Sequence, residues 1–126
     1  MKRISLNRIL QLHTKMIIAT GGDSGVRDIG LLDSALSNAF ATFDGKELYE
    51  SVEEKCASIC FSIINNHPFI DGNKRMGIFV MLVLLEYNDI KLNYNQEALV
   101  NLGLGTAKGD YKQDHILQWI LEHKIT

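Results

Sequence analysis

The chain has 126 residues, with 13 basic and 15 acidic side chains and a formal net charge of −2. This length predicts one domain, residues 1–126, with a single hydrophobic core. The nearly balanced charge gives no general attraction to nucleic acid or anionic lipid, so we expect no direct DNA binding and no membrane association. The apolar run at residues 78–85 is far shorter than the roughly 20 residues of a membrane span. No secretory signal is visible, and the expected location is cytoplasmic.

An amphipathic helix is expected from residue 6 to about residue 19, with Ser5 as its N-cap. Its apolar stripe consists of Leu6, Ile9, Leu10, His13 and Ile17. His13 is expected to be a packing or surface residue, like His115 and His123, because no set of partner residues accompanies any of them.

The next segment, residues 21–30, is rich in glycine. It matches neither the P-loop nor the dinucleotide fingerprint, and no strand precedes it, so a structural turn is favoured over a phosphate site. A second helix is expected over residues 31 to about 43, with Phe43 on its buried face. The polar connection over residues 43–50 is either an ordinary loop or a flap beside the active site.

Two very apolar helices follow. Ser51 and Glu54 form a capping box that begins the third helix. The fourth helix begins at Asn73 or Lys74 and runs to about residue 88. Both are apolar around most of their circumference, which is typical of helices in the centre of a bundle.

The C-terminal part predicts two more helices. After a turn over residues 88–93, with room for a short extended piece at 90–92, Asn95 caps a fifth helix that runs to about residue 107. Asp110 and Gln113 form a second capping box at the start of the last helix. No convincing paired strands are present. The predicted fold class is all-α, a compact bundle of about six helices with a polar loop between the two central ones.

That loop is His67-Pro68-Phe69-Ile70-Asp71-Gly72-Asn73-Lys74-Arg75. Pro68 prevents continuation of the third helix and biases His67 towards an extended conformation. Gly72 permits unusual backbone angles, and Asn73 is a good N-cap for the fourth helix. The polar groups therefore gather at a helix N-terminus, where free N–H groups and the helix dipole favour an anion such as phosphate.

Each residue type in the loop suits phosphoryl or nucleotidyl transfer. Arg75 can hold phosphate oxygens bidentately, and Asn73 can donate to them with the backbone amides. Asp71 offers a carboxylate to magnesium, and His67 can accept a hydroxyl proton near neutral pH. The structural alternative is that His67 only caps a helix, that the Asp-Gly-Asn run is turn chemistry and that Lys74 and Arg75 form a solvated helix start.

Cys56 and Cys60 lie four positions apart on the third helix. They are expected to be buried free thiols, because this spacing is poor evidence for a disulfide. Together with His67 they supply only three ligands in apolar surroundings, which argues against a metal site, and a buried neutral thiol is a poor nucleophile.

The loop resembles the signature of the Fic/Doc family, His-x-Phe-x-(Asp/Glu)-(Gly/Ala)-Asn-x-Arg. The opening helix, the Gly21-Gly22 turn, the length and the final helix resemble the Doc (death-on-curing) toxins of toxin–antitoxin modules within that family. The resemblance implies that His67 is the general base for a hydroxyl of a target protein and that Phe69 turns inward to pin the loop. It also implies a bound ATP and Mg²⁺. Asp71 would ligate Mg²⁺, while Gly72, Asn73, Lys74 and Arg75 would hold the phosphates.

This chain differs from the AMP-transferring members of the family at two positions that bear on which reaction it catalyses. This chain has Lys74 where they carry glycine, and Ile78 where they carry a second arginine. The Doc toxins share both features, although Pro68 and Gly72 are more similar to the broader Fic pattern. The resemblance therefore implies a protein kinase that phosphorylates a translation factor similar to EF-Tu, and a Phd-like antitoxin whose C-terminal segment binds as a helix. The alternatives are transfer of AMP or another nucleotide to a protein hydroxyl, and a catalytically silent binding module.

Overall fold

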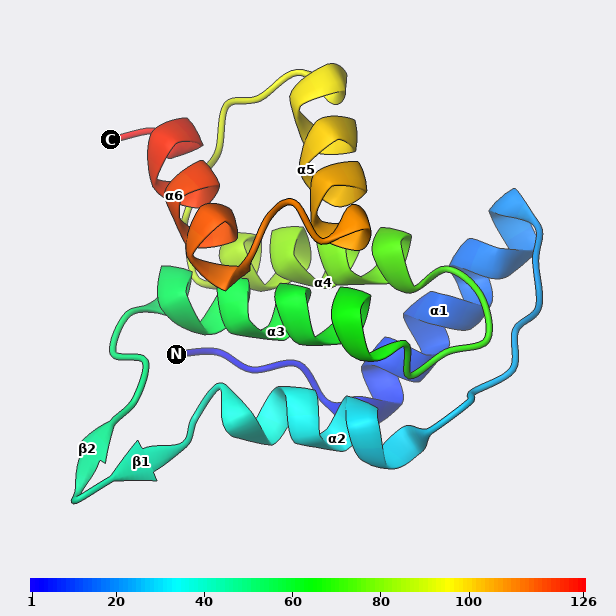
Figure 1. The fold of residues 1–126 in the computed structure, drawn as a ribbon, viewed down its shortest axis with the longest axis horizontal. Helices are drawn as coiled ribbons and strands as arrows, with labels where there is room; N and C mark the ends of the chain where they lie inside the picture. Colours follow the sequence, from blue (N-terminus) through cyan, green and yellow to red (C-terminus); the bar gives the residue numbers. More distant parts are fainter.

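The computed structural model describes all residues, 1–126, as six helices and one short hairpin (Figure 1). The elements are α1 (Leu6–Thr20), α2 (Ile29–Asn38), β1 (Thr42–Phe43), β2 (Lys46–Glu47), α3 (Val52–Asn66), α4 (Asn73–Tyr87), α5 (Gln96–Lys108) and α6 (Gln113–His123). The all-α bundle predicted from the sequence is confirmed. None of the six helices combines the length and the apolarity needed to cross a membrane.

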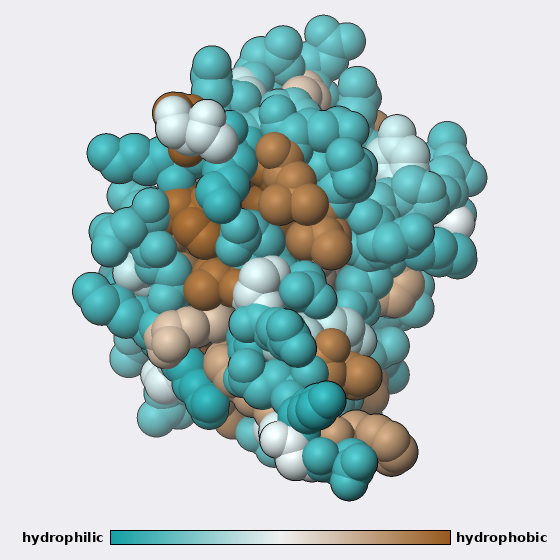
Figure 2. Space-filling view, turned by 90° about the vertical axis from the view of Figure 1, so that its left-hand side faces the viewer, coloured by the Kyte–Doolittle hydropathy of each residue, from teal (hydrophilic) through white to brown (hydrophobic).

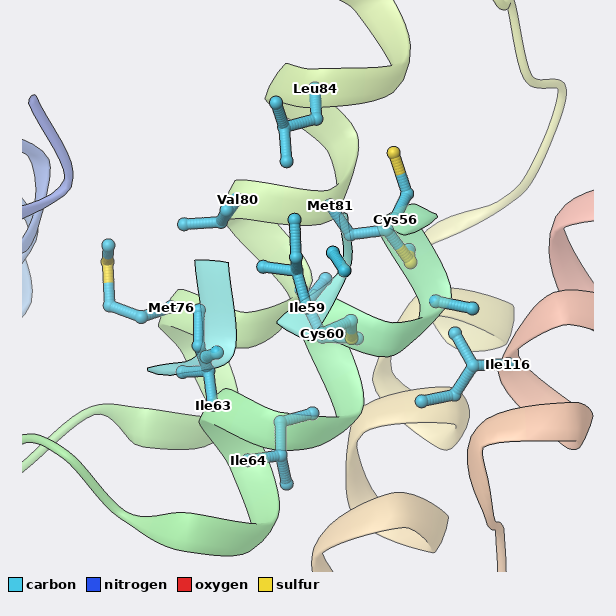
Figure 3. Packing of buried hydrophobic residues seen from close by; sticks show 14 of the residues in the cluster. Cys56, Ile59, Cys60, Ile63, Ile64, Met76, Val80, Met81, Leu84 and Ile116 are labelled. Carbon is cyan, nitrogen blue, oxygen red and sulfur yellow. The ribbon is translucent and has the colours of Figure 1, made fainter. Parts of the chain in front are cut away.

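The centre of the fold is the pair α3 and α4, which run antiparallel and pack more extensively against each other than any other two elements do. Helices α2 and α6 pack on α3, and α5 packs on α4. Figure 3 shows the side chains that fill this region, with Ile116 entering from α6. The labelled members of this core are Cys56, Ile59, Cys60, Ile63, Ile64, Met76, Val80, Met81 and Leu84.

Most helix starts follow the predicted caps. The hydroxyl of Ser5 accepts from the Arg8 amide, and the capping box of Ser51 and Glu54 is formed. Helix α6 is an exception, because the predicted cap Asp110 lies before its start. Lys112 occupies the cap position instead, and its backbone N–H donates to Nδ1 of His115 at 2.9 Å.

The second helix was predicted about two residues late at its start and five too long at its end. It begins at Ile29 because the side chain of Asp28 accepts from the Leu31 amide and provides the N-cap. It ends at Asn38, so Phe43 lies on β1 and is 81% exposed instead of buried.

The hairpin β1–β2 was not predicted from the sequence. Thr42 pairs with Glu47 and Phe43 with Lys46, around a turn of Asp44 and Gly45. Both turn residues have positive φ, 54° and 77°, as the two-residue turns that match strand twist require. The hairpin lies at the opposite end of α3 from the polar loop (Figure 1), so residues 43–50 are not a flap beside that loop.

The base of the hairpin is held by a buried lysine. Lys55 of α3 is 4% exposed, and its ammonium donates to the carbonyl oxygens of Tyr49 and Glu50 and pairs with Glu47 at 3.3 Å. The face with the hairpin and both termini is mostly hydrophilic with grouped apolar side chains (Figure 2). A hollow of about 580 Å³ lies at the C-terminal end of α4 and is lined mainly by apolar residues such as Leu82 and Leu85.

Candidate active site

The polar loop, residues 67–75, connects the two central helices through a sharp reversal. His67 ends α3 in the left-handed conformation, with φ 53° and ψ 60°, instead of the extended one expected before Pro68. Proline disfavours the right-handed helical region for its predecessor, and here the chain leaves that region through the left-handed conformation, which is a common way to end a helix. Gly72 precedes α4 with φ 81°, so two left-handed residues define the turn.

Asn73 closes the loop and does not cap α4. Gly72 occupies the cap position, and Asn73 is the first helical residue. Its side-chain oxygen accepts from the Phe69 N–H, and its amide group donates to the Phe69 carbonyl, both at 2.9 Å. Asn73 is only 8% exposed, so this side chain fixes the loop from inside.

The same amide group approaches the imidazole of His67. The distance from Nδ2 of Asn73 to Nδ1 of His67 is 3.4 Å, at the long end for a hydrogen bond. Because an amide nitrogen only donates, this contact requires Nδ1 to be unprotonated. The imidazole itself is exposed, so it is free to turn towards an incoming group.

Helix α1 forms a platform under the loop. Phe69, 1% exposed, stacks on His13 with ring centroids 3.8 Å apart and an angle of 10° between the planes. Nε2 of His13 donates to the carbonyl oxygen of Asp71 at 2.8 Å. Met16 lies so close to Gly72 that a Cβ there would come within 2.6 Å of its Cε. Gly72 is therefore needed for its backbone angle, whereas the flexible end of Met16 could move aside for a Cβ.

The glycine-rich residues 21–28, here named the strap, lie against the outer side of the loop (Figure 1). The guanidinium of Arg27 donates to the carbonyls of Asn66 and His67, both at 2.6 Å, and its backbone N–H donates to Pro68 at 2.8 Å. The Ile70 N–H donates to the Gly25 carbonyl at 3.1 Å. The predicted structural turn is thus a support that fixes the end of α3 and the middle of the loop.

The ionisable side chains of the loop all reach solvent at least in part. His67 and Asp71 are exposed, and Lys74 and Arg75 are partly buried at the N-terminus of α4. Neither cation takes part in an ion pair of the structure. Arg75 does hydrogen-bond the hydroxyl of Thr20 at the end of α1. Two cations without a carboxylate partner at a helix N-terminus form an anion-binding arrangement.

Asp71 is the one carboxylate within the loop, residues 67–75, that could bind a magnesium ion. One oxygen of Asp71 accepts from the Asp23 N–H at 2.8 Å, and no three metal-ligating side chains come together anywhere in the structure. Magnesium is commonly held by one or two carboxylates together with substrate phosphates. The donor set therefore fits magnesium that arrives with a nucleotide.

His13 and Arg27 hold the loop, and neither was predicted from the sequence as a residue of the site. His13 was predicted to be a packing or surface residue without partners, but it is 1% exposed and bonded to the loop. The available signal was its place on the apolar stripe of α1, because a histidine in such a stripe must find a buried partner. Arg27 has no comparable signal in the sequence.

The site and fold define a helical domain in which a histidine-to-arginine loop joins two central helices. Residues 3–85 match a model described as the Fic/DOC family. The chain belongs to the Fic/DOC family.

Two characterised-by-name proteins, both called Doc, are similar to this chain in sequence. "Toxin Doc" of Mycolicibacterium smegmatis is 39% identical over 75 residues, or 60% of this chain, and the match spans 58% of the length of that protein. "Protein kinase doc" of Escherichia phage P1 is 26% identical over 110 residues, 87% of this chain and 86% of that protein.

Proposed function

We propose that this protein is the toxin of a toxin–antitoxin module and acts as a protein kinase that transfers the γ-phosphate of ATP to a hydroxyl of a target protein. The observation that carries the proposal is the accessible imidazole of His67 beside two cations, Lys74 and Arg75, that have no carboxylate partner at the N-terminus of α4. The names of the two relatives, a toxin and a protein kinase, support it.

In this proposal each accessible group has one task. His67 accepts the proton of the target hydroxyl while the hydroxyl oxygen attacks the γ-phosphorus, and the bond to the leaving ADP breaks. Lys74, Arg75 and the backbone amides beside Gly72 and Asn73 hold the phosphates, and Asp71 provides an oxygen to magnesium. Proton acceptance through Nε2 needs that nitrogen to be unprotonated, which places the proton of the neutral imidazole on Nδ1. A protonated Nδ1 cannot accept from the Asn73 amide, so the imidazole gives up this long contact when substrate binds.

The resemblance to the Doc toxins, which share Lys74 and Ile78 with this chain, favours phosphate transfer over AMP transfer. The methylene stem of Lys74 lies along α5, where a Cβ on Gly103 would come within 3.3 Å of its Cγ. Ile78, 8% exposed, faces the same glycine and supplies no second phosphate clamp. A lysine next to the phosphates fills space that glycine would leave open and adds one charge. Transfer of AMP to a protein hydroxyl is the second candidate, because the histidine and the anion site would serve it equally.

The finer parts of the proposal concern partners and come from the family resemblance. The target is a cytoplasmic translation factor similar to EF-Tu. The antitoxin is a Phd-like protein whose C-terminal segment folds on binding as a helix. A disordered segment that folds on its partner is a suitable inhibitor for a toxin that must be released, because ordering costs part of the binding free energy.

The test uses ATP labelled at either the γ or the α phosphate, incubated with the protein and a bacterial lysate. Label from the γ position and a gain of about 80 Da on the target are expected for phosphate, against about 329 Da for AMP. Label from the α position alone would overturn kinase activity. His67→Ala should abolish transfer and growth inhibition, whereas His115→Ala, on the exposed side of α6, should change neither. Growth inhibition that survives His67→Ala would indicate the silent binding module.

A further inference from the structure

Helix α1 carries a buried histidine, His13, that makes a long-range hydrogen bond in addition to its packing contacts. Among the buried polar residues of the structure, Asn73 and Thr106 bond within or near their own helices, but His13 bonds to a residue 58 positions away. Burying an imidazole costs free energy unless it is hydrogen-bonded. The hydrogen bond of His13 goes to the loop that bears the reactive groups.

The proton on His13 can be placed from its partner. A backbone carbonyl only accepts, so the 2.8 Å contact with Asp71 requires the proton on Nε2. The same imidazole stacks on Phe69, two residues earlier. One side chain therefore fixes the loop through a hydrogen bond and through an aromatic contact, and substitutions can separate the two.

The carbonyl that His13 holds belongs to the peptide unit between Asp71 and Gly72. Gly72 has φ 81° and ψ 19°, and glycine rotates more freely about φ than any other residue. The Asp71 carboxylate is fixed on its other side by the Asp23 N–H of the strap, at 2.8 Å. The direction of the carboxylate thus depends on two donors, one to the carbonyl and one to the carboxylate.

We propose that His13 is a positioning residue: its Nε2–H orients the Asp71–Gly72 peptide and so aims the Asp71 carboxylate at the cation that accompanies the nucleotide. This inference rests on the proposed function for the identity of that cation. The effect of His13 on the orientation of the carboxylate does not depend on the proposed function. His13 is 1% exposed and takes no proton from substrate.

The test compares His13→Phe with His13→Gln. Phenylalanine keeps the stacked ring and removes the donor, whereas the glutamine amide can reach the same carbonyl and loses the ring. His115→Phe on α6 is the control for the same replacement away from the loop; it removes the hydrogen bond with the Lys112 N–H. The first readout is the backbone amide of Asp23 in the ¹⁵N spectrum without nucleotide, because this N–H reports where the carboxylate lies. The second is the magnesium concentration that gives half-maximal transfer.

For His13→Phe we expect a displaced Asp23 resonance and a half-maximal magnesium concentration raised about five- to tenfold, the factor for one buried hydrogen bond. His13→Gln should restore both. An unchanged Asp23 resonance in a folded His13→Phe would overturn the inference. A folded His13→Gln protein that behaves like His13→Phe would also overturn the inference. If His13→Phe does not fold, the test is whether the Asp23 resonance of His13→Gln matches that of the native protein, and a mismatch would overturn the inference. A native protein without phosphate transfer would overturn the proposed function and leave the Asp23 readout intact.

Discussion

Gly77 of α4 lies directly against α3, and we expect its replacement by alanine to destabilise the protein. A Cβ at this position would lie 2.5 Å from Cγ1 of Ile64 and 2.9 Å from the carbonyl oxygen of Cys60. The carbonyl belongs to the backbone of α3, so it cannot move aside without the helix. The substitution therefore forces the two central helices apart.

Two opposing contributions set the magnitude. Alanine in a helix interior is more favourable than glycine by about 0.5–1 kcal/mol. An extra methyl group in a well-packed core costs about 1–3 kcal/mol. The difference predicts a net loss of about 1–2 kcal/mol in the free energy of unfolding, taking the upper part of the cost because one contact is backbone. For a domain of this size the midpoint of thermal unfolding should fall by about 3–10 °C.

The measurement is thermal and urea unfolding followed by circular dichroism, with Gly103→Ala as the control. At Gly103 of α5 the added Cβ meets Cγ of Lys74 at 3.3 Å and Cδ at 3.5 Å, and this flexible stem can give way. The control should be as stable as the native protein or more so, by up to about 1 kcal/mol. A Gly77→Ala protein that is as stable as Gly103→Ala would refute the reasoning about the helix crossing.

Three further predictions concern thiols, an ion pair and a cap. Burial raises the pKa of Cys56 to about 12, with the charge of Glu53 adding to the effect, and burial also raises the pKa of Cys60. Neither thiol should react with a disulfide reagent at pH 8 until urea unfolds the chain; labelling of the folded protein would contradict this. Burial opposes ionisation of Glu53, but the hydrogen bond from Lys124 at 2.8 Å and its charge outweigh it, and the pKa of Glu53 is lowered. The stability that this pair contributes is present above the usual glutamate pKa and lost at lower pH. The loss in the free energy of unfolding caused by Lys124→Met at pH 7 should therefore shrink below about pH 4. Equal losses in urea titrations at both pH values would refute this prediction. Ser51→Ala should cost about 1 kcal/mol in urea unfolding and Ser51→Gly only a few tenths, with equal losses speaking against a cap.

The sequence predicts the helices well because their signals are local. Apolar periodicity and the capping residues Ser5, Ser51 and Asn95 identify elements within a few positions. The errors are also local in origin. Asp28 was not considered as a cap, and Asp44-Gly45, a strong hairpin signal, was taken as part of a polar connection.

In the candidate site, the reactive groups could be predicted from the sequence, but the residues that support them could not. The reactive groups form one continuous segment, residues 67–75, so a motif in the sequence contains them all. What holds them comes from far away in the chain, since His13 bonds 58 positions away and Arg27 about 40 positions away. Periodicity and propensity carry no information about such pairings, and only the folded chain shows that α1 and the strap support the loop.

The hairpin and the reactive loop lie at opposite ends of α3, a helix of 15 residues that is about 20 Å long. The tip at Asp44 and Gly45 is exposed and touches no part of the loop's supports. Insertions and exchanges at this tip should therefore leave the arrangement of the reactive loop unchanged, and an experimenter can place a fluorophore or a foreign peptide there. The reactive end of the molecule is thus held by several distant segments, and the hairpin end is held by neighbouring residues of its own segment.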